Sequence, residues 1–174
     1  IDHALDLARA AGARRIVVNT HYHADQMAAH LEGKGVLISP EPGPILETGG
    51  GLKAALPMLG PGLVAVLNSD AIWTGANPLK ELAEAWDGAR MEALLLLQPA
   101  DQARGTGGKG DFRCDAMGRI SRGAGGEDQV YLGASILDPA RLAAIPDPVF
   151  SLNRPWDQMI AAGTAFGTGH RGGW

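Results

Sequence analysis

The sequence is short of several features that mark particular classes of protein. It has one cysteine in 174 residues, Cys114, so it cannot form an internal disulfide or a cluster of cysteine metal ligands. No apolar run approaches the roughly 18–20 residues of a membrane-spanning helix, and no charged-then-apolar signal segment opens the chain. We therefore expect a cytoplasmic protein with no membrane partner, in which Cys114 is a structural residue.

An excess of positive charge is also missing. The formal net charge is -4, which gives no general attraction for nucleic acid or for an anionic membrane. The chain has instead 45% hydrophobic and 20% charged residues, a balance that supplies the core of one compact domain. We predict a single domain over 1–174 with a small-molecule ligand, so that any recognition of phosphate is local. The sequence leaves the oligomeric state open.

Helical and strand patterns alternate along the chain. Helices are expected at 2–12, 24–31, 52–59, 78–86 and 155–162, and strands at 15–19, 36–39, 63–67, 93–97 and 130–137. This alternation is typical of a parallel sheet covered by helices on both faces. The strand at 63–67 is wholly apolar, so we expect it to be central and buried on both faces. Two short strands around a turn within 112–120 add an antiparallel part.

Three unusual segments follow strands of this predicted sheet. They are the glycine triplet 49–51, the string Asn68-Ser69-Asp70 and the string His21-Tyr22-His23. In an open parallel sheet, ligands bind beyond the carboxyl ends of the strands, where such segments lie. These three segments are therefore the first candidates for a binding site.

The glycine triplet stands directly before the helix-forming run 52–56. Glycines are tolerated in such number where the backbone needs left-handed dihedrals or must approach another group closely. Two interpretations stay open. The triplet is a tight loop packed close to the sheet, or its amides at a helix N-terminus bind an anion or the polar edge of a base.

Asp70 ends the most apolar strand. Desolvation of a carboxylate at such a place is costly unless a cation compensates it, and Mg²⁺ held by phosphate oxygens is a suitable cation. The alternative is that Asp70 caps the following turn. Trp73, which follows soon after, is expected to line the same cleft.

Two further segments give weaker signals. His21 and His23 could ligate a metal from one face of an extended segment, but no third ligand is evident, so we favour a structural or capping role. The glycine-rich loop 105–110 does not have the spacing of a phosphate-binding loop and better suits a mobile loop over a sugar.

The order of these segments resembles that of the sugar-1-phosphate nucleotidyltransferases. The resemblance covers nearly the whole chain, and its most specific strings are Leu46-Glu47-Thr48-Gly49-Gly50-Gly51 and Asn68-Ser69-Asp70-Ala71-Ile72-Trp73. Further strings are Gly110-Asp111-Phe112, Gly133-Ala134-Ser135-Ile136-Leu137 and Phe150-Ser151-Leu152-Asn153-Arg154. Within the family the chain is most similar to the bacterial N-acetylmuramic acid-1-phosphate uridylyltransferases, whose members also carry the name mannose-1-phosphate guanylyltransferase.

The resemblance implies a Rossmann-like three-layer α/β/α nucleotidyltransferase fold with a mixed, mostly parallel central sheet. It implies Mg²⁺-dependent attack of a sugar-1-phosphate on the α-phosphate of a nucleoside triphosphate, with release of pyrophosphate. In this branch UTP and N-acetylmuramic acid-1-phosphate give UDP-N-acetylmuramic acid, a step of cell-wall (peptidoglycan) recycling. The alternatives are another hexose-1-phosphate nucleotidyltransferase, specific for GTP or dTTP, and a non-catalytic regulatory module that binds nucleotide sugars. A scaffold without a ligand would leave Asp70 and the triplet unexplained.

The resemblance also assigns roles to individual residues. Asp70 is the predicted catalytic residue, as one of two carboxylates that hold Mg²⁺. The predicted nucleotide-binding residues are Glu47, Thr48, Gly49, Gly50 and Asn68. The predicted sugar-binding residues are Trp73, Gly110, Asp111 and Asn153.

Two motifs of the family are not in the sequence. A G-x-G-x-R loop with a Pro-Lys pair, which cradles the triphosphate, would stand before Ile1, and the second metal carboxylate would stand after Trp174. The structural segments continue normally up to both ends of 1–174. We therefore expect a nucleotidyltransferase domain without its N-terminal signature loop and its C-terminal end.

Overall fold

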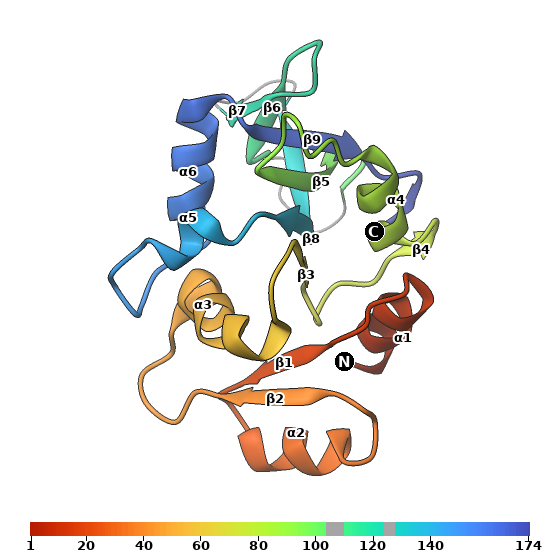
Figure 1. Ribbon diagram of the computed structural model, residues 1–174. Helices are drawn as coiled ribbons and strands as arrows, with labels where there is room; N and C mark the ends of the chain where they lie inside the picture. Colours follow the sequence, from red (N-terminus) through yellow and green to blue (C-terminus); the bar gives the residue numbers. More distant parts are fainter. Residues whose placement is uncertain (104–109, 124–127) are drawn as a thin grey trace.

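The structure, a computed structural model, describes residues 1–103, 110–123 and 128–174 (Figure 1). Its helices are α1 (Asp2–Ala10), α2 (Ala24–Leu31), α3 (Glu47–Leu59), α4 (Pro78–Ala85), α5 (Ala140–Ala143) and α6 (Asn153–Ala162). Its strands are β1 (Val17–Thr20), β2 (Leu37–Pro40), β3 (Val64–Leu67), β4 (Thr74–Gly75), β5 (Ala93–Pro99), β6 (Phe112–Cys114), β7 (Ile120–Arg122), β8 (Gln129–Leu137), β9 (Ala165–Gly169) and β10 (Gly172–Gly173). Every helix and strand expected from the sequence is found, whereas α5, β4, β9 and β10 were not expected. Among the described residues, none of the helices has the length and hydrophobicity needed to cross a bilayer.

The described strands form three sheets. β1 and β2 pair in parallel, and β4 and β10 form a short antiparallel pair. The six-stranded sheet has the order β7-β6-β8-β5-β9, with β3 also paired to β8. The expected mixed sheet is confirmed, and β3, β5 and β9 run in one direction. Most hydrogen-bonded pairs are nevertheless antiparallel, because β8 runs against its three neighbours β3, β5 and β6.

Two hydrophobic cores lie on opposite faces of the six-stranded sheet. Leu95 and Leu97 of β5 pack in the core that includes residues of α3, α5 and α6, whereas Leu94 and Leu96 pack in the core with α1 and α4. Alternate side chains of a strand point to opposite faces, so a strand between two helical layers is apolar throughout. The expected three-layer α/β/α arrangement is therefore confirmed.

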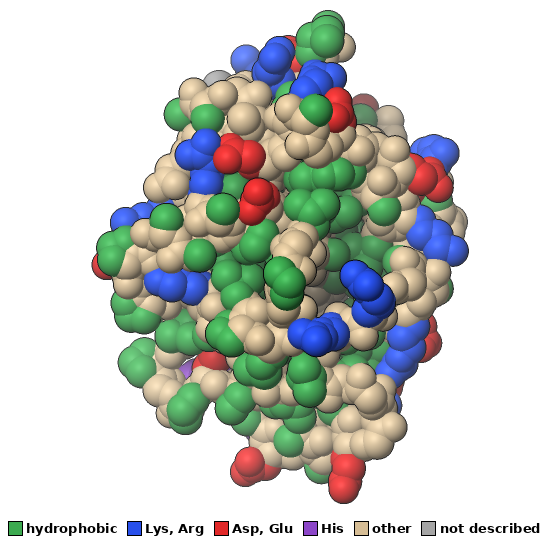
Figure 2. Space-filling view, viewed as in Figure 1, with side chains coloured by type: hydrophobic (Ala, Val, Ile, Leu, Met, Phe, Trp, Pro, Cys, Tyr) green, Lys and Arg blue, Asp and Glu red, His purple; other side chains and the backbone are tan. Residues whose placement is uncertain are grey.

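β3 differs from the expectation for a central strand. Val64 is buried, but Ala65 is exposed and the preceding Leu63 is 52% exposed, so the prediction of burial on both faces is wrong. Among the described residues β3 pairs only with β8, and β1 pairs only with β2. One backbone edge of each strand is thus without a strand partner there. Figure 2 shows hydrophobic side chains gathered around a hollow in the middle of the face on which Figure 1 places β3.

Candidate active site

The glycine triplet lies inside α3, not in front of it. α3 begins at Glu47, whose positive φ of 58° turns the chain into the helix. The N–H groups of Gly49 and Gly50 both donate to the carbonyl of Phe150, at 2.9 Å. Amides of a first helical turn have no partner within their own helix, and here a distant loop supplies one. The structure corrects the expectation that these two amides are free to bind an anion or a base.

The space beside the three glycines is also filled. A Cβ on Gly50 would stand 2.1 Å from the carbonyl oxygen of Pro148, and a Cβ on Gly49 would stand 2.5 Å from the ring of Phe150. A Cβ on Gly51 would stand 2.8 Å from Oε1 of Glu41. Of the two interpretations that the sequence leaves open, these contacts support close packing.

Glu41, which the sequence analysis missed, ties the entry of α3 to β1. Its Oε1 accepts a hydrogen bond from Nδ2 of Asn19 at 3.2 Å, and its Oε2 accepts one from the N–H of Leu46 at 3.0 Å. Nδ2 of Asn19 also donates to the carbonyl of Gly51 at 2.9 Å. The only signal in the sequence was one acidic residue within a loop of prolines and glycines.

The first turns of α3 and α6 lie side by side. Oγ1 of Thr48 accepts a hydrogen bond at 3.0 Å from the N–H of Leu152, which directly precedes Asn153, the first residue of α6. The structure thus brings Thr48, predicted to bind nucleotide, next to Asn153, predicted to bind sugar. The side chains of Glu47 and Asn153 are exposed, and they make no hydrogen bond with any of the described residues.

Asn68 and Asp70 leave the carboxyl end of β3, and both are exposed. The N–H of Asn68 donates to the carbonyl of Gly133 at 2.8 Å, which extends the pairing of β3 with β8 by one residue. The carboxylate of Asp70 forms no hydrogen bond or ion pair within the described part of the chain. It does not cap the following turn, so it is available to a ligand.

Gly110 and Asp111 reach the same edge of β8. The N–H of Asp111 donates to the carbonyl of Gln129 at 2.8 Å, and its Oδ2 accepts from the N–H of Tyr131 at 2.9 Å. Asn68 is bonded to Gly133 on this edge, which places it roughly 7 Å along the strand from Tyr131. The structure therefore brings the predicted metal segment close to two of the predicted sugar-binding residues.

Gly133 allows Asn68, at the end of β3, to approach β8 closely. Its φ is 78°, and the pairing of β5 with β8 shifts register between Leu95 and Leu97, opposite this part of β8. A Cβ on Gly133 would stand 2.9 Å from the Cβ of Asn68. The sequence analysis placed Gly133 in a strand and in one string of the family resemblance. It did not predict the approach of Asn68, because this is a long-range contact.

Trp73 does not line an open cleft, which corrects the prediction made for it. Its side chain is 2% exposed and packs in the core that includes Leu79 and Leu82 of α4. Its ring stacks on that of His3, with 6.5 Å between the centroids. Trp73 therefore anchors the loop that follows Asp70. The predicted loop 105–110 lies outside the described residues, apart from Gly110.

The remaining candidates have structural contacts. Nδ1 of His21 lies 2.9 Å from the carbonyl oxygen of Glu41, and His23, with a φ of 51°, stands directly before α2. Burial, together with the charge of Asp115, raises the pKa of the Cys114 thiol, so this cysteine is not an activated nucleophile. The described ranges contain no group of three or more His, Cys, Asp or Glu side chains that could hold a metal ion.

Asp70 suits one ligand position of a divalent ion. Mg²⁺ is usually bound through one or two carboxylates, with substrate phosphates and water completing its shell. An exposed, unpaired carboxylate fits such a shared site, and the described residues offer no complete protein cage. The bound nucleotide and water would supply further ligands.

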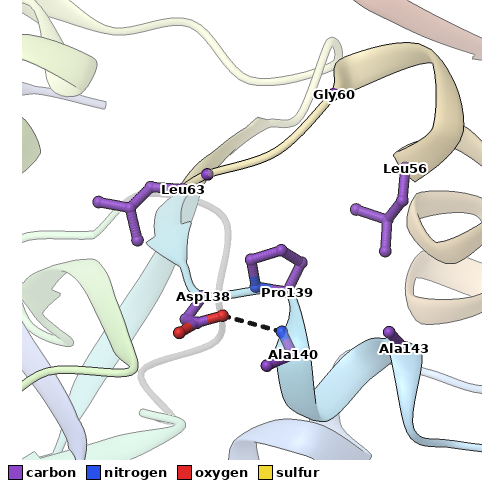
Figure 3. A pocket seen from close by; sticks show the side chains of 8 residues that line it. Leu56, Gly60, Leu63, Asp138, Pro139, Ala140 and Ala143 are labelled. Atoms are coloured by element: carbon purple, nitrogen blue, oxygen red, sulfur yellow. Dashed lines mark hydrogen bonds between the residues drawn. The ribbon is translucent and has the colours of Figure 1, made fainter.

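A hollow of about 350 Å³ lies away from Asp70 and the first turn of α3 (Figure 3). Its lining is mostly apolar and consists of Leu56, Gly60, Gly62, Leu63, Asp138, Pro139, Ala140 and Ala143. Leu63 precedes β3 and Asp138 follows β8, so the hollow lies at the end of this antiparallel pair that is opposite to Asp70. It is not part of the candidate site.

Comparison with known proteins assigns the chain to a family. Residues 1–150 match the family model described as a MobA-like NTP transferase domain. The chain is 40% identical, over an alignment of 185 residues, to the N-acetylmuramate alpha-1-phosphate uridylyltransferase of Caulobacter vibrioides. The alignment covers 100% of this chain and 76% of that protein. Proteins of this family generally use a divalent metal ion.

Solved structures share the fold at low sequence identity. HddC from Yersinia pseudotuberculosis, also solved in complex with GMP-PN, has a TM-score of 0.73 and 18% identity over 97% of this chain and 75% of its own. A putative glucose-1-phosphate thymidylyltransferase from Bacillus anthracis, in complex with a sucrose, has a TM-score of 0.76 and 14% identity over 100% of this chain and 74% of its own. With the family match and the identity to the Caulobacter enzyme, the chain belongs to the sugar-1-phosphate nucleotidyltransferases that carry a MobA-like NTP transferase domain.

Proposed function

We propose that this protein transfers UMP from UTP to N-acetylmuramic acid-1-phosphate, forming UDP-N-acetylmuramic acid and pyrophosphate. The observation that carries the proposal is the 40% identity across the whole chain to the Caulobacter uridylyltransferase. The exposed, unpaired Asp70 at the end of β3 adds support, because the reaction needs a group that can hold a metal near two phosphates. The product would serve the recycling of cell-wall sugars.

The chemistry requires no covalent intermediate with the protein. An oxygen of the sugar phosphate attacks the α-phosphorus of UTP, the bond from that phosphorus to the bridging oxygen breaks, and pyrophosphate leaves. The protein contributes by aligning the two phosphates and by neutralising their charge. Asp70 would hold Mg²⁺, which in its bound state neutralises phosphate oxygens.

We propose that the substrates lie between the end of β3, the first turn of α3 and the start of β6. Glu47 and Asn68, both exposed, would contact the nucleotide. The sugar would meet Asn153, Gly110 and the oxygen of Asp111 that Tyr131 does not occupy. Thr48, Gly49 and Gly50 would act indirectly, because their hydrogen bonds with Leu152 and Phe150 hold the turn that carries Glu47.

We further propose that the catalytic unit extends beyond these residues, with the triphosphate loop before Ile1 and a second metal carboxylate after Trp174. The strand edges of β1 and β3 that have no partner among the described residues support this, as does the 76% share of the Caulobacter enzyme that is aligned. The intact mass of the natural protein tests it, since a mass of 18.1 kDa would contradict it. We place the protein in the cytoplasm, where nucleoside triphosphates are made, and cell fractionation tests this.

Pyrophosphate release by the full-length protein tests the reaction. UTP, GTP and dTTP are each combined with N-acetylmuramic acid-1-phosphate, mannose-1-phosphate and glucose-1-phosphate, with Mg²⁺ or with a chelator. We expect the fastest release with UTP and N-acetylmuramic acid-1-phosphate, and none with the chelator. A faster rate with another pair would overturn the substrate assignment. Nucleotide binding without release for any pair would instead support a regulatory module.

A further inference from the structure

Glu81 is a buried carboxylate on α4, outside the candidate site, with an exposed fraction of 5%. Its Oε1 accepts hydrogen bonds from the backbone N–H and from Nε of Arg171, both at 2.9 Å. Its Oε2 lies 2.5 Å from Nδ1 of His170. Burial alone raises the pKa of Glu81, but the hydrogen bonds from Arg171 and His170 outweigh burial and hold the pKa below its usual range. A charged, buried group therefore binds two adjacent residues of the segment after β9.

α4 has other stabilising contacts besides Glu81. Asn77 caps the helix by accepting hydrogen bonds from the N–H groups of Leu79 and Lys80, and Leu82 is fully buried in the core. A buried ion pair is weak evidence of stabilisation, because desolvation offsets much of its attraction, but such pairs can favour one arrangement of the chain. The arrangement favoured here is that of His170 and Arg171.

His170 and Arg171 lead directly into β10, which pairs with β4. Gly172 lies opposite Gly75, and Gly173 lies opposite Thr74. The pairing is close, since a Cβ on Gly172 would stand 1.9 Å from the carbonyl oxygen of Thr74 and 2.8 Å from Nε2 of His170. β4 thus pairs with β10, and Glu81 holds the two residues before β10, together with the hydrogen bond that the N–H of His170 donates to the carbonyl of Leu97 at 3.0 Å.

β4 closes the loop that carries Asp70. The loop begins where Asn68 donates to Gly133 and ends at the pairing of β4 with β10, and the buried Trp73 fixes it between these points. Asp70 itself is exposed. Both ends of the loop are held by other elements, and one of these attachments leads back to Glu81.

We infer that Glu81 is a positioning residue for Asp70. By holding His170 and Arg171 it keeps β10 against β4, and so sets the direction from which the Asp70 carboxylate meets the metal and the nucleotide. Glu81 touches no substrate, because it is buried under this segment. The inference rests on the proposed function of Asp70.

The test compares Glu81→Gln with Glu84→Gln in the full-length enzyme. Glu84 lies on the same helix and accepts a hydrogen bond from Nη2 of Arg171 at 2.9 Å, but its side chain is 66% exposed, which makes it a matched control. For Glu81→Gln we expect faster amide exchange at 68–75, unchanged exchange in β1 and β2, and roughly tenfold lower kcat. The Mg²⁺ concentration for half-maximal rate should rise, while the KM for the sugar phosphate should not change. Glu84→Gln should match the wild type.

A folded Glu81→Gln enzyme with unchanged exchange at 68–75 and unchanged Mg²⁺ dependence would overturn the inference. If Glu81→Gln does not fold, Arg171→Ala tests the same link, because this side chain is 69% exposed and donates to Glu81. Unchanged exchange at 68–75 in that variant would also overturn it. Full activity of Asp70→Asn would instead remove the metal role of Asp70 and leave the exchange result valid, so the two failures can be told apart.

Discussion

The first turn of α3 and the end of β3 both look like ligand-binding segments in the sequence, yet they are built in opposite ways. In α3 the amides of Gly49 and Gly50 are bonded to Phe150, and the space beside them is filled. At the end of β3 the Asp70 carboxylate is exposed and has no partner among the described residues. A group that the protein already satisfies must lose a contact before it can bind a ligand, whereas an unpaired carboxylate need not. The contacts of the glycines are those of close packing, and we propose Asp70 as the group that binds a ligand.

The largest expected effect belongs to the end of β3. Asp70→Asn should lower kcat by about 10²–10³-fold, because charge stabilisation acts mainly in the transition state. The melting temperature should change little, because the side chain is exposed. Steady-state pyrophosphate release and thermal denaturation measure the two effects. The neighbouring Ser69→Ala is the control and should keep near-normal turnover. Normal turnover in Asp70→Asn would remove the metal role.

The first turn of α3 should respond in the opposite sense. Gly50→Val should destabilise the fold by about 3 kcal/mol, because its Cβ would stand 2.1 Å from the carbonyl oxygen of Pro148. Thermal denaturation should show this as a lower melting temperature. Gly43→Val is the control, since a Cβ at Gly43 meets nothing within 4 Å. A raised KM for the nucleotide at an unchanged melting temperature would show that Gly50 serves the ligand instead.

Gly133 links packing to the site. Gly133→Ala should cost about 1–2 kcal/mol, because alanine is strained at a φ of 78°, and it should also lower kcat by displacing Asn68. Gly118→Ala is matched in backbone strain, with a φ of 81°, but the nearest atom to its Cβ is 3.6 Å away. Urea unfolding should show a loss for both variants, and a larger one for Gly133→Ala because of its contact with Asn68. If both also lose turnover equally, the contact of Gly133 with Asn68 is not what matters.

The smallest expected effect concerns Glu92, a carboxylate that is paired with Arg141 of the same protein. Nε of Arg141 donates to Oε2 of Glu92 at 2.8 Å and holds the pKa of Glu92 below its usual range. A carboxylate whose pKa is lower in the folded state stabilises the protein at pH values above its pKa in the unfolded state, about 4.3 for Glu. This contribution disappears as the pH falls through the pKa of the folded state.

Arg141→Gln should therefore lower the free energy of unfolding by about 1 kcal/mol or less at pH 7. The difference from the wild type should shrink in acid, as the pH falls below the unfolded pKa of Glu92 and through its lowered folded pKa. Urea unfolding at pH 7 and in acid measures it, and turnover at pH 7 should not change. A difference that stays the same in acid would show that packing, not charge, is lost.

Local patterns were enough to place the main elements. The apolar run of β5 predicts burial on both faces because alternate side chains point to opposite sides, and Leu94 and Leu95 do enter different cores. The same reasoning was wrong for β3, where the side chain of Ala65 is exposed. Periodicity reports which residues are apolar, but not which surfaces cover them.

The candidate site was predictable in part. The local pattern predicts that Asp70 follows an apolar strand. It also predicts that the first turn of α3 lies close to the sheet. The contacts of Gly50 with the loop at 148–150, of Gly133 with Asn68 and of Glu81 with His170 join segments far apart in the chain. A glycine in the sequence indicates that another group can approach closely, and a carboxylate indicates that a partner is required. Which group makes the contact is decided only by the packing of segments that are distant in the chain.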